Sequence, residues 1–234
     1  MGVFCFLFCF SGTVSAASLV AHWEFNEPSG STASDSSGNG NDGTLHNMND
    51  SDWVSGQWGN ALDFDCSNDY VSVSDDSSMD FGTGSFSISL WVIADNYNNQ
   101  SMMIINGTSG GGYSGKRYSF RYDDNDVIFV VDDNTTKTRV ETTTNFLHGG
   151  AWHHVVAVRD RGSDKMRIYV DGSQSVEAGD NTNNSIDSPN EPVYIGRDGI
   201  DNNSNYVDGR LDDIRLYDFV LSSDDVEDIY DGTK

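Results

Sequence analysis

Three tyrosines occupy positions where a carbohydrate-binding surface would need aromatic rings. Tyr97 follows Asp95-Asn96, Tyr113 lies in a glycine-rich run, and Tyr206 follows a run of Asn and Ser. An aromatic ring offers a sugar an apolar platform, and neighbouring amide and carboxylate groups bind its hydroxyls. We predict that Tyr97, Tyr113 and Tyr206 contact a glycan; the alternative is that they lie in solvated loops.

Two arginines could add positive charge to such a site. Arg117 and Arg121 lie four residues apart in the run Arg-Tyr-Ser-Phe-Arg-Tyr. Because successive side chains on a strand alternate between its two faces, both arginines would share one face. That face could bind an acidic sugar, and the alternative is an ordinary exposed strand face.

The carboxylates form no recognisable catalytic pattern. Glycosidases need two carboxylates across a cleft, one of them a proton donor. None of the six glutamates has another glutamate two or four residues away, and pairs such as Asp63 and Asp65 arise by chance among 31 aspartates. A serine nucleophile elbow, a phosphate-binding loop and a dinucleotide fingerprint are also missing from the sequence. We expect a binding protein rather than an enzyme.

The charge of the chain excludes one class of partner. Its 234 residues hold 37 Asp and Glu against 13 Lys and Arg, which gives a net charge of −24. Such a charge repels phosphate-rich partners, so we expect neither nucleic acid nor an anionic membrane surface. The acidity indicates either a solvated surface, as in many secreted proteins, or adaptation to high salt.

The first residues have the features of a secretory signal. Val3–Phe10 is a short apolar run, and Val14-Ser15-Ala16 follows as a small-x-small cleavage pattern, although no Lys or Arg precedes the run. We expect residues 1–16 to be a signal peptide and residues 17–234 to be one secreted or cell-surface domain without membrane insertion. Cys66 would be the one cysteine left, so the mature domain would hold no internal disulfide.

The rest of the chain has the periodicity of short β-strands. Alternating or continuous apolar runs such as Phe86–Val92 and Trp152–Val158 are separated by clusters of Gly, Asn, Asp and Ser. Asp160–Asp164 and Asp171-Gly172 predict hairpin turns. Ser222–Tyr230 predicts one helix with a capping box. The pattern indicates an all-β, two-sheet antiparallel sandwich with a short C-terminal helix. We expect all five tryptophans, Trp58 included, to pack inside it.

Four segments, in order along the chain, together carry a family resemblance: Leu19–Glu27 with Asp35–Leu45, Gly59–Asp65 with Asp69–Val71, Trp152–Val155 with Ile168–Gly172, and Gly209–Tyr217 with the final helix. They resemble the laminin-G-like jelly-roll domain of the concanavalin A-like lectin/glucanase superfamily. The resemblance spans residues 17–234 and implies a jelly-roll sandwich for that range.

The resemblance also implies a structural calcium site, as in many members. Ca²⁺ takes six to eight oxygen ligands from carboxylates, amides and carbonyls. Asp35, Asn39 and Asn41 lie in one Gly-rich loop, Glu24 lies on the strand before it, and Asp212 occupies a position where the family has a near-constant Asp. We predict these five residues as ligands. The alternative is that the loop residues only form turns through side-chain-to-backbone hydrogen bonds.

Taken together, these features predict a secreted, non-catalytic binding module that takes a glycan and holds a structural calcium ion. One alternative is a protein-adhesion module that binds an extracellular or cell-surface protein, because this fold hosts both functions. A second alternative is a polysaccharide hydrolase or lyase with an unrecognised site.

Overall fold

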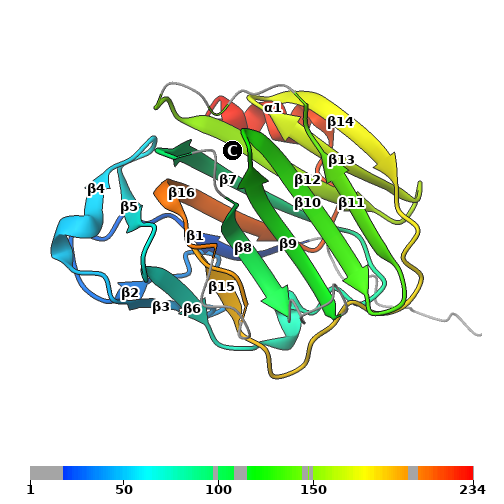
Figure 1. Ribbon diagram of the computed structural model, residues 1–234, viewed down its shortest axis with the longest axis horizontal. Helices are drawn as coiled ribbons and strands as arrows, with labels where there is room; N and C mark the ends of the chain where they lie inside the picture. Colours follow the sequence, from blue (N-terminus) through cyan, green and yellow to red (C-terminus); the bar gives the residue numbers. More distant parts are fainter. Residues whose placement is uncertain are drawn as a thin grey trace, which may run out of the picture.

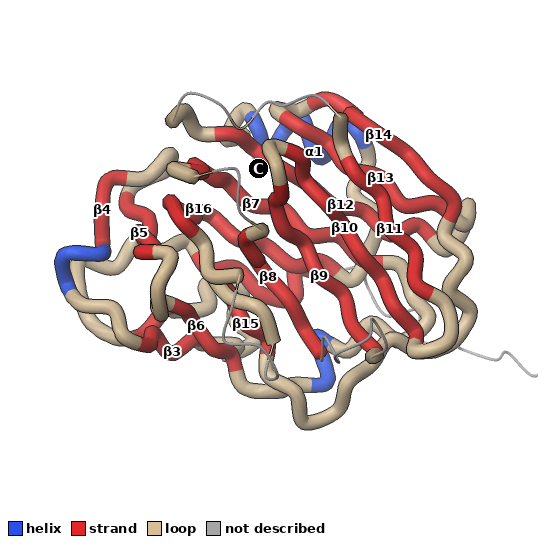
Figure 2. Tube along the Cα trace, viewed as in Figure 1, coloured by secondary structure: helices blue, strands red, loops and turns tan. Residues whose placement is uncertain are grey.

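The computed structural model describes residues 18–96, 100–107, 115–143, 147, 150–199 and 205–233, and within them the chain forms two antiparallel eight-stranded sheets. The first sheet has the order β14-β13-β12-β7-β16-β5-β4. Its eighth strand, β1, pairs with the second half of β16, and β5 pairs with the first half. The second sheet has the order β11-β10-β9-β8-β15-β6-β3-β2. The two sheets overlie one another in Figures 1 and 2, which confirms the predicted all-β sandwich.

The strands of the first sheet are β1 (Leu19–Trp23), β4 (Trp53–Ser55), β5 (Asn60–Asp65), β7 (Phe86–Ala94), β12 (His153–Asp160), β13 (Lys165–Val170), β14 (Ser173–Gly179) and β16 (Asp208–Tyr217). Those of the second sheet are β2 (Thr32–Ala33), β3 (Gly43–His46), β6 (Tyr70–Val73), β8 (Ser101–Gly107), β9 (Lys116–Asp123), β10 (Asp126–Asp133), β11 (Lys137–Glu141) and β15 (Val193–Ile195). Short 3-10 turns cover Asp50–Asp52 and Ser77–Met79, and helix α1 covers Ser223–Tyr230.

The core lies between the two sheets and is built by alternation along the strands. Phe86 of β7 stacks on Phe81 at 4.5 Å between ring centroids, and Phe129 of β10 meets Phe86 edge-on at 5.8 Å. Strand β7 is buried along its whole length, because neighbouring segments cover both of its faces. This explains why its sequence changes from alternating to continuously apolar.

Helix α1 covers part of the outer face of the first sheet. Val226 and Ile229 pack with Val156 and Tyr169 in a second, smaller apolar cluster. The predicted capping box is present, since the Ser222 hydroxyl accepts from the backbone N–H of Asp225 at 3.1 Å and the Asp225 carboxylate accepts from that of Ser222 at 2.9 Å. No helix among the described residues is long and apolar enough to cross a membrane.

The two predicted hairpins are confirmed. Asp160–Asp164 joins β12 to β13, and Asp171-Gly172 joins β13 to β14. Both residues of the second turn have a positive φ, 47° and 77°, as a two-residue hairpin of this kind requires.

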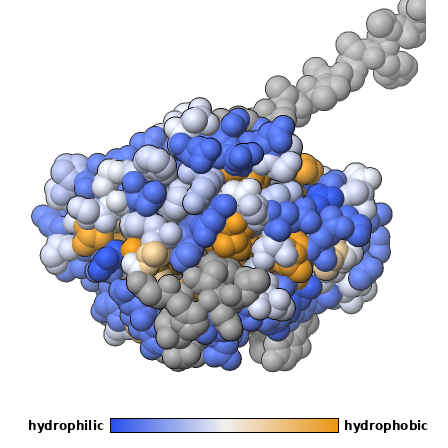
Figure 3. Space-filling model, turned by 90° about the horizontal axis from the view of Figure 1, so that it is seen from above, coloured by the Kyte–Doolittle hydropathy of each residue, from blue (hydrophilic) through white to orange (hydrophobic). Residues whose placement is uncertain are grey.

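The surface seen in Figure 3 is mostly hydrophilic, with apolar residues in small separate groups.

His154 of β12 is a fully buried polar side chain. Its Nε2 atom lies 2.8 Å from the hydroxyl of Ser89 on the neighbouring strand β7. Burial lowers the pKa of His154 from 6.5 to about 4, because the apolar surroundings disfavour the charged imidazolium. In the folded protein this histidine is therefore neutral at pH 7.

The substitution His154→Gln tests whether folding lowers the pKa of His154. An unfolded chain takes up a proton here below pH 6.5 while the folded chain stays neutral until about pH 4, so stability falls as the pH drops through this window. Between pH 7.5 and pH 5 the wild type should lose about 2 kcal/mol more free energy of unfolding than the variant. Urea denaturation at the two pH values measures this difference, and parallel pH profiles would show that His154 does not titrate as described.

Candidate functional site

Strand β16 contains a bulge at the point where its neighbour on one side changes. It pairs with β5 up to Leu211 and with β1 from Ile214 onwards, and its register against β7 shifts between Asp212 and Arg215. Asp213 has a left-handed φ of 49°. Leu211 and Ile214 both enter the core, so the extra residue of the bulge turns two consecutive carboxylates away from it.

The first of these carboxylates fixes the turn between β4 and β5. Asp212 is fully buried, and one of its oxygens accepts the backbone N–H groups of Gln57 at 2.8 Å and Trp58 at 3.0 Å. The turn also needs a glycine at position 56, because a Cβ there would lie only 2.6 Å from the same Asp212 oxygen. Burial and the adjacent charge of Asp213 raise the pKa of Asp212 to about 7.

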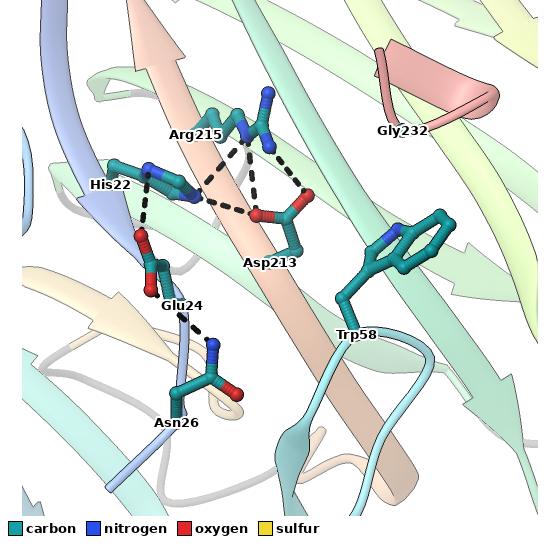
Figure 4. A pocket seen from close by; sticks show the side chains of 7 residues that line it. All are labelled: His22, Glu24, Asn26, Trp58, Asp213, Arg215 and Gly232. Carbon is teal, nitrogen blue, oxygen red and sulfur yellow. Dashed lines mark hydrogen bonds and ion pairs between the residues drawn. The ribbon is translucent and has the colours of Figure 1, made fainter. Parts of the chain in front are cut away.

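The second carboxylate belongs to a charged group on the outer face of the first sheet. Asp213 Oδ1 lies 2.6 Å from His22 Nε2 on β1, and Asp213 Oδ2 lies 3.1 Å from an Arg215 guanidinium nitrogen (Figure 4). Burial alone would raise the pKa of Asp213, but the hydrogen bond with His22 and the charge of Arg215 hold it below its usual value. Asp213 is therefore ionised and fixed in place at neutral pH.

These side chains border a pocket of about 180 Å³ lined by His22, Glu24, Asn26, Trp58, Asp213, Arg215 and Gly232. Trp58 stands at one side of it, opposite the group formed by His22 and Glu24 (Figure 4). With 42% of its surface exposed, it is the only large hydrophobic residue that the described part of the chain exposes. Its ring meets Trp91 edge-on at 6.3 Å, and a Cβ at Gly232 would come within 2.8 Å of it. Trp58 is thus held in place by Trp91 and Gly232 while part of its ring stays open to solvent.

The pocket combines an aromatic plate with hydrogen-bonding groups of fixed orientation. Glu24 keeps part of its side chain exposed while it accepts from Ser36 at 3.0 Å and from Asn26 at 3.3 Å. Such a pairing of one ring face with carboxylate, amide and guanidinium groups suits a ligand that has both an apolar face and several hydroxyls.

The predicted calcium loop is tied to β1 by hydrogen bonds. The Asp35 carboxylate accepts backbone N–H groups from His22, Ser37 and Asn41, each at 2.9 Å. These bonds lower the pKa of Asp35 although burial opposes them. The side-chain amides of Asn39 and Asn41 donate to Val20 O at 3.0 and 2.9 Å, so their nitrogens, rather than their oxygens, point at β1.

The five predicted calcium ligands are not brought together as one ligand set. Glu24 lines the pocket, Asp212 lies under the β4–β5 turn, and Asp35, Asn39 and Asn41 form the loop. Among the described residues there is no group of three or more His, Cys, Asp or Glu side chains placed to hold a metal ion. Calcium binding at these residues stays a prediction.

The predicted sugar-contacting residues fall in several places. Tyr97 and Tyr113 lie outside the described residues, and Tyr206 is half-buried just before β16. Arg117 and Arg121 share the outer face of β9, because Tyr118, Phe120 and Tyr122 between and beside them enter the core.

The sequence interpretation missed the pocket. The prediction that Trp58 packs inside the domain is wrong: its ring contacts Trp91 edge-on and lies close to Gly232, and 42% of the residue is exposed. His22, Asp213 and Arg215 had no motif to mark them. The position of Trp58 in a Gly-Gln-Trp-Gly turn is the one available signal, since large aromatics are unusual in tight turns.

Asp212 can be tested as the residue that holds the β4–β5 turn. Asp212→Ala leaves the Gln57 and Trp58 N–H groups without an acceptor and should cost about 2–4 kcal/mol of stability. Asp212→Asn keeps an acceptor oxygen and should cost less. Urea denaturation followed by tryptophan fluorescence measures both, and the account fails if both variants unfold at the wild-type midpoint.

The calcium prediction is tested by thermal melting in EDTA, in millimolar CaCl₂ and in NaCl of matched ionic strength. A calcium site at the Asp35 loop predicts a rise in Tm that only CaCl₂ produces, because binding to the native state stabilises it by mass action. The variant Asp35→Asn should lose that rise. An equal rise in NaCl would instead indicate screening of the −24 charge.

Comparisons with known proteins agree with this architecture. Solved structures that resemble the chain include the binding domain of Paraclostridial Mosquitocidal Protein 1 (TM-score 0.70, 18% identity, 92% of this chain and 52% of that one). They also include the botulinum neurotoxin serotype D ligand-binding domain in complex with N-acetylneuraminic acid (0.67, 15%, 92% and 51%). This chain therefore spans about half the length of those two structures.

A third structure is matched over almost its whole length. It is domain 4 of AbnA, a GH43 extracellular arabinanase from Geobacillus stearothermophilus, in complex with arabinotriose (TM-score 0.65, 19% identity, 92% of this chain and 98% of that one). A search of curated proteins found no match. The family model Laminin_G_3 matches residues 65–227, which is more than half of the chain. The protein therefore belongs to this family, described as the concanavalin A-like lectin/glucanases superfamily.

Proposed function

We propose that this protein is a non-catalytic carbohydrate-binding module that receives a sugar in the Trp58 pocket. The observation that carries the proposal is the exposure of Trp58 beside a group of fixed polar side chains. Two relatives of the same fold were solved with a saccharide, arabinotriose in one and N-acetylneuraminic acid in the other, which supports a sugar as the ligand class.

The chemistry of the pocket suits one sugar ring. The apolar face of a pyranose or furanose would lie against the open side of Trp58, and its hydroxyls would meet Glu24, Asn26 and Arg215. At about 180 Å³ the pocket is smaller than the roughly 300 Å³ at which sites for drug-sized ligands begin. It would therefore take a terminal sugar or a single unit of a chain.

Binding is favoured over hydrolysis by the state of Asp213. A glycosidase needs a proton-donating carboxyl group whose pKa is raised. The pKa of Asp213, the buried carboxyl that lines this pocket, is held below its usual value instead. The neighbouring carboxyl with a raised pKa, Asp212, does not line the pocket and is held under the β4–β5 turn by the N–H groups of Gln57 and Trp58. Asp213 therefore orients His22 and Arg215 rather than delivering a proton.

Binding of a sugar is also favoured over adhesion to a flat protein surface. Trp58 is the one large hydrophobic side chain exposed in the described part of the chain, so those residues offer no broad apolar patch. A module of this kind would act outside the cell, in keeping with the signal peptide proposed for residues 1–16.

The substitution Trp58→Ala tests the proposal. The wild type should bind at least one member of an oligosaccharide array that includes arabinotriose and N-acetylneuraminic acid. Trp58→Ala should weaken that binding by about tenfold or more, and Trp58→Phe should weaken it less because a ring remains. Isothermal titration calorimetry measures the affinities.

Phe219→Ala is the matched control. This aromatic residue packs on Tyr217 at 5.2 Å and does not line the pocket, so its removal should leave sugar binding unchanged. Full binding by a folded Trp58→Ala variant would contradict the proposal.

A further inference from the structure

The pocket beside Trp58 holds more negative than positive charge. Two carboxylates, Glu24 and Asp213, line it together with one guanidinium group, that of Arg215. This guanidinium group already binds Asp213 at two points, because its Nε atom donates to Asp213 Oδ1 at 3.2 Å and a terminal nitrogen lies 3.1 Å from Asp213 Oδ2. The ion pair balances the charge of Asp213 and leaves that of Glu24.

The Glu24 carboxylate is oriented by neutral donors. Its Oε1 atom accepts from the Ser36 hydroxyl at 3.0 Å, and its Oε2 atom accepts from the Asn26 amide at 3.3 Å. The ring of His22 approaches it only to 3.8 Å, and no Lys or Arg in the described part of the chain pairs with it. Because 44% of the Glu24 side chain is exposed, a ligand can reach its remaining acceptor positions.

Trp58 offers a second feature that suits a cation. The face of an indole ring carries partial negative charge, so it attracts an ammonium group within about 6 Å of the ring centroid. The same face takes the apolar C–H groups of a sugar ring. Figure 4 shows Trp58 and Glu24 on opposite sides of the pocket, and the cavity of about 180 Å³ between them has room for one sugar unit.

We propose that the Trp58 pocket selects an amino sugar, with Glu24 binding the protonated amino group, an inference that rests on the proposed function of the pocket as a sugar site. An ammonium group forms a charge-assisted hydrogen bond with a carboxylate, which is roughly twice as strong as the neutral bond of a hydroxyl in the same place. The sugar ring then lies against Trp58, and Asn26 meets a neighbouring hydroxyl.

The same charges disfavour an acidic sugar. Its carboxylate would face Glu24 and would compete with Asp213 for the one guanidinium group that lines the pocket. Asp213 is buried and its pKa is held below its usual value, so separating it from Arg215 would leave a buried charge without a partner. The net charge of −24 acts in the same direction at longer range, since it attracts a cation and repels an anion.

The test compares the methyl glycosides of glucosamine, galactosamine and mannosamine with those of the parent hexoses, which carry a hydroxyl in place of the amino group. Calorimetry at pH 7 and low salt should show at least one amino glycoside binding about tenfold more tightly than its parent, and this advantage should shrink as NaCl rises. N-acetylation removes the charge and should abolish the advantage. If no amino glycoside binds more tightly than its parent, the proposal is wrong.

A variant locates the charge that makes the selection. Glu24→Gln keeps the size of the side chain and removes its charge, so the variant should bind the amino glycoside and its parent with similar affinity. Glu141→Gln is the matched control, because it removes a carboxylate with 38% of its side chain exposed from β11 of the second sheet, outside the pocket, and should keep the preference. A preference that survives in Glu24→Gln would overturn the assignment to Glu24.

The outcomes separate this inference from the proposed function. A neutral or acidic sugar that binds the wild type at least as tightly as the amino glycosides, and that Trp58→Ala fails to bind, would overturn the selection of an amino sugar and leave the sugar pocket in place. Amino glycoside binding that Trp58→Ala retains in full would contradict both.

Discussion

The bulge in β16 is the constraint on which the candidate site depends. A regular strand would send Asp212 and Asp213 to opposite faces of the sheet, and one of these carboxylates would enter the apolar core. The extra residue, with Asp213 in the left-handed region, sends both outward. One carboxylate then holds the turn that carries Trp58, and the other holds His22 and Arg215. The bulge lies where β5 gives way to β1 beside β16, so segments distant in sequence meet at this point.

The preference for aspartate over glutamate, 31 to 6, follows in part from the loops that join these strands. An aspartate side chain is short enough to accept hydrogen bonds from nearby backbone N–H groups. Asp133 does so toward Thr135 and Thr136 and also holds Asn183 and Asn184 of a distant loop. Burial opposes its ionisation, yet these bonds hold the pKa of Asp133 well below its usual value. Much of the acidity of the chain thus performs a structural task within loops.

The fold could be predicted from the sequence because its signals are local. Alternation along the strands, the Asp171-Gly172 turn and the Ser222 capping box each depend on a few adjacent residues. The candidate site could not be predicted from the sequence, because its residues come from β1, the β4–β5 turn, β16 and the segment after α1. Sequence periodicity does not show which of these segments lie next to one another in the fold. The exposure of Trp58 could not be predicted for a related reason: Gly232, which lies close to its ring, is remote from it in sequence. The shared face of Arg117 and Arg121 followed from alternation alone.

The central claim is that Trp58 forms the platform of a sugar site built by the β16 bulge. The most direct test follows the tryptophan indole N–H signals in ¹H–¹⁵N spectra during a titration with an oligosaccharide that the protein binds. The account predicts that the Trp58 signal shifts with ligand concentration. The signals of Trp23 and Trp53 should stay in place, because their indole N–H groups donate to Asn41 O at 2.8 Å and Gly30 O at 3.1 Å, away from the pocket. A saturable shift elsewhere with the Trp58 signal unmoved would contradict the account.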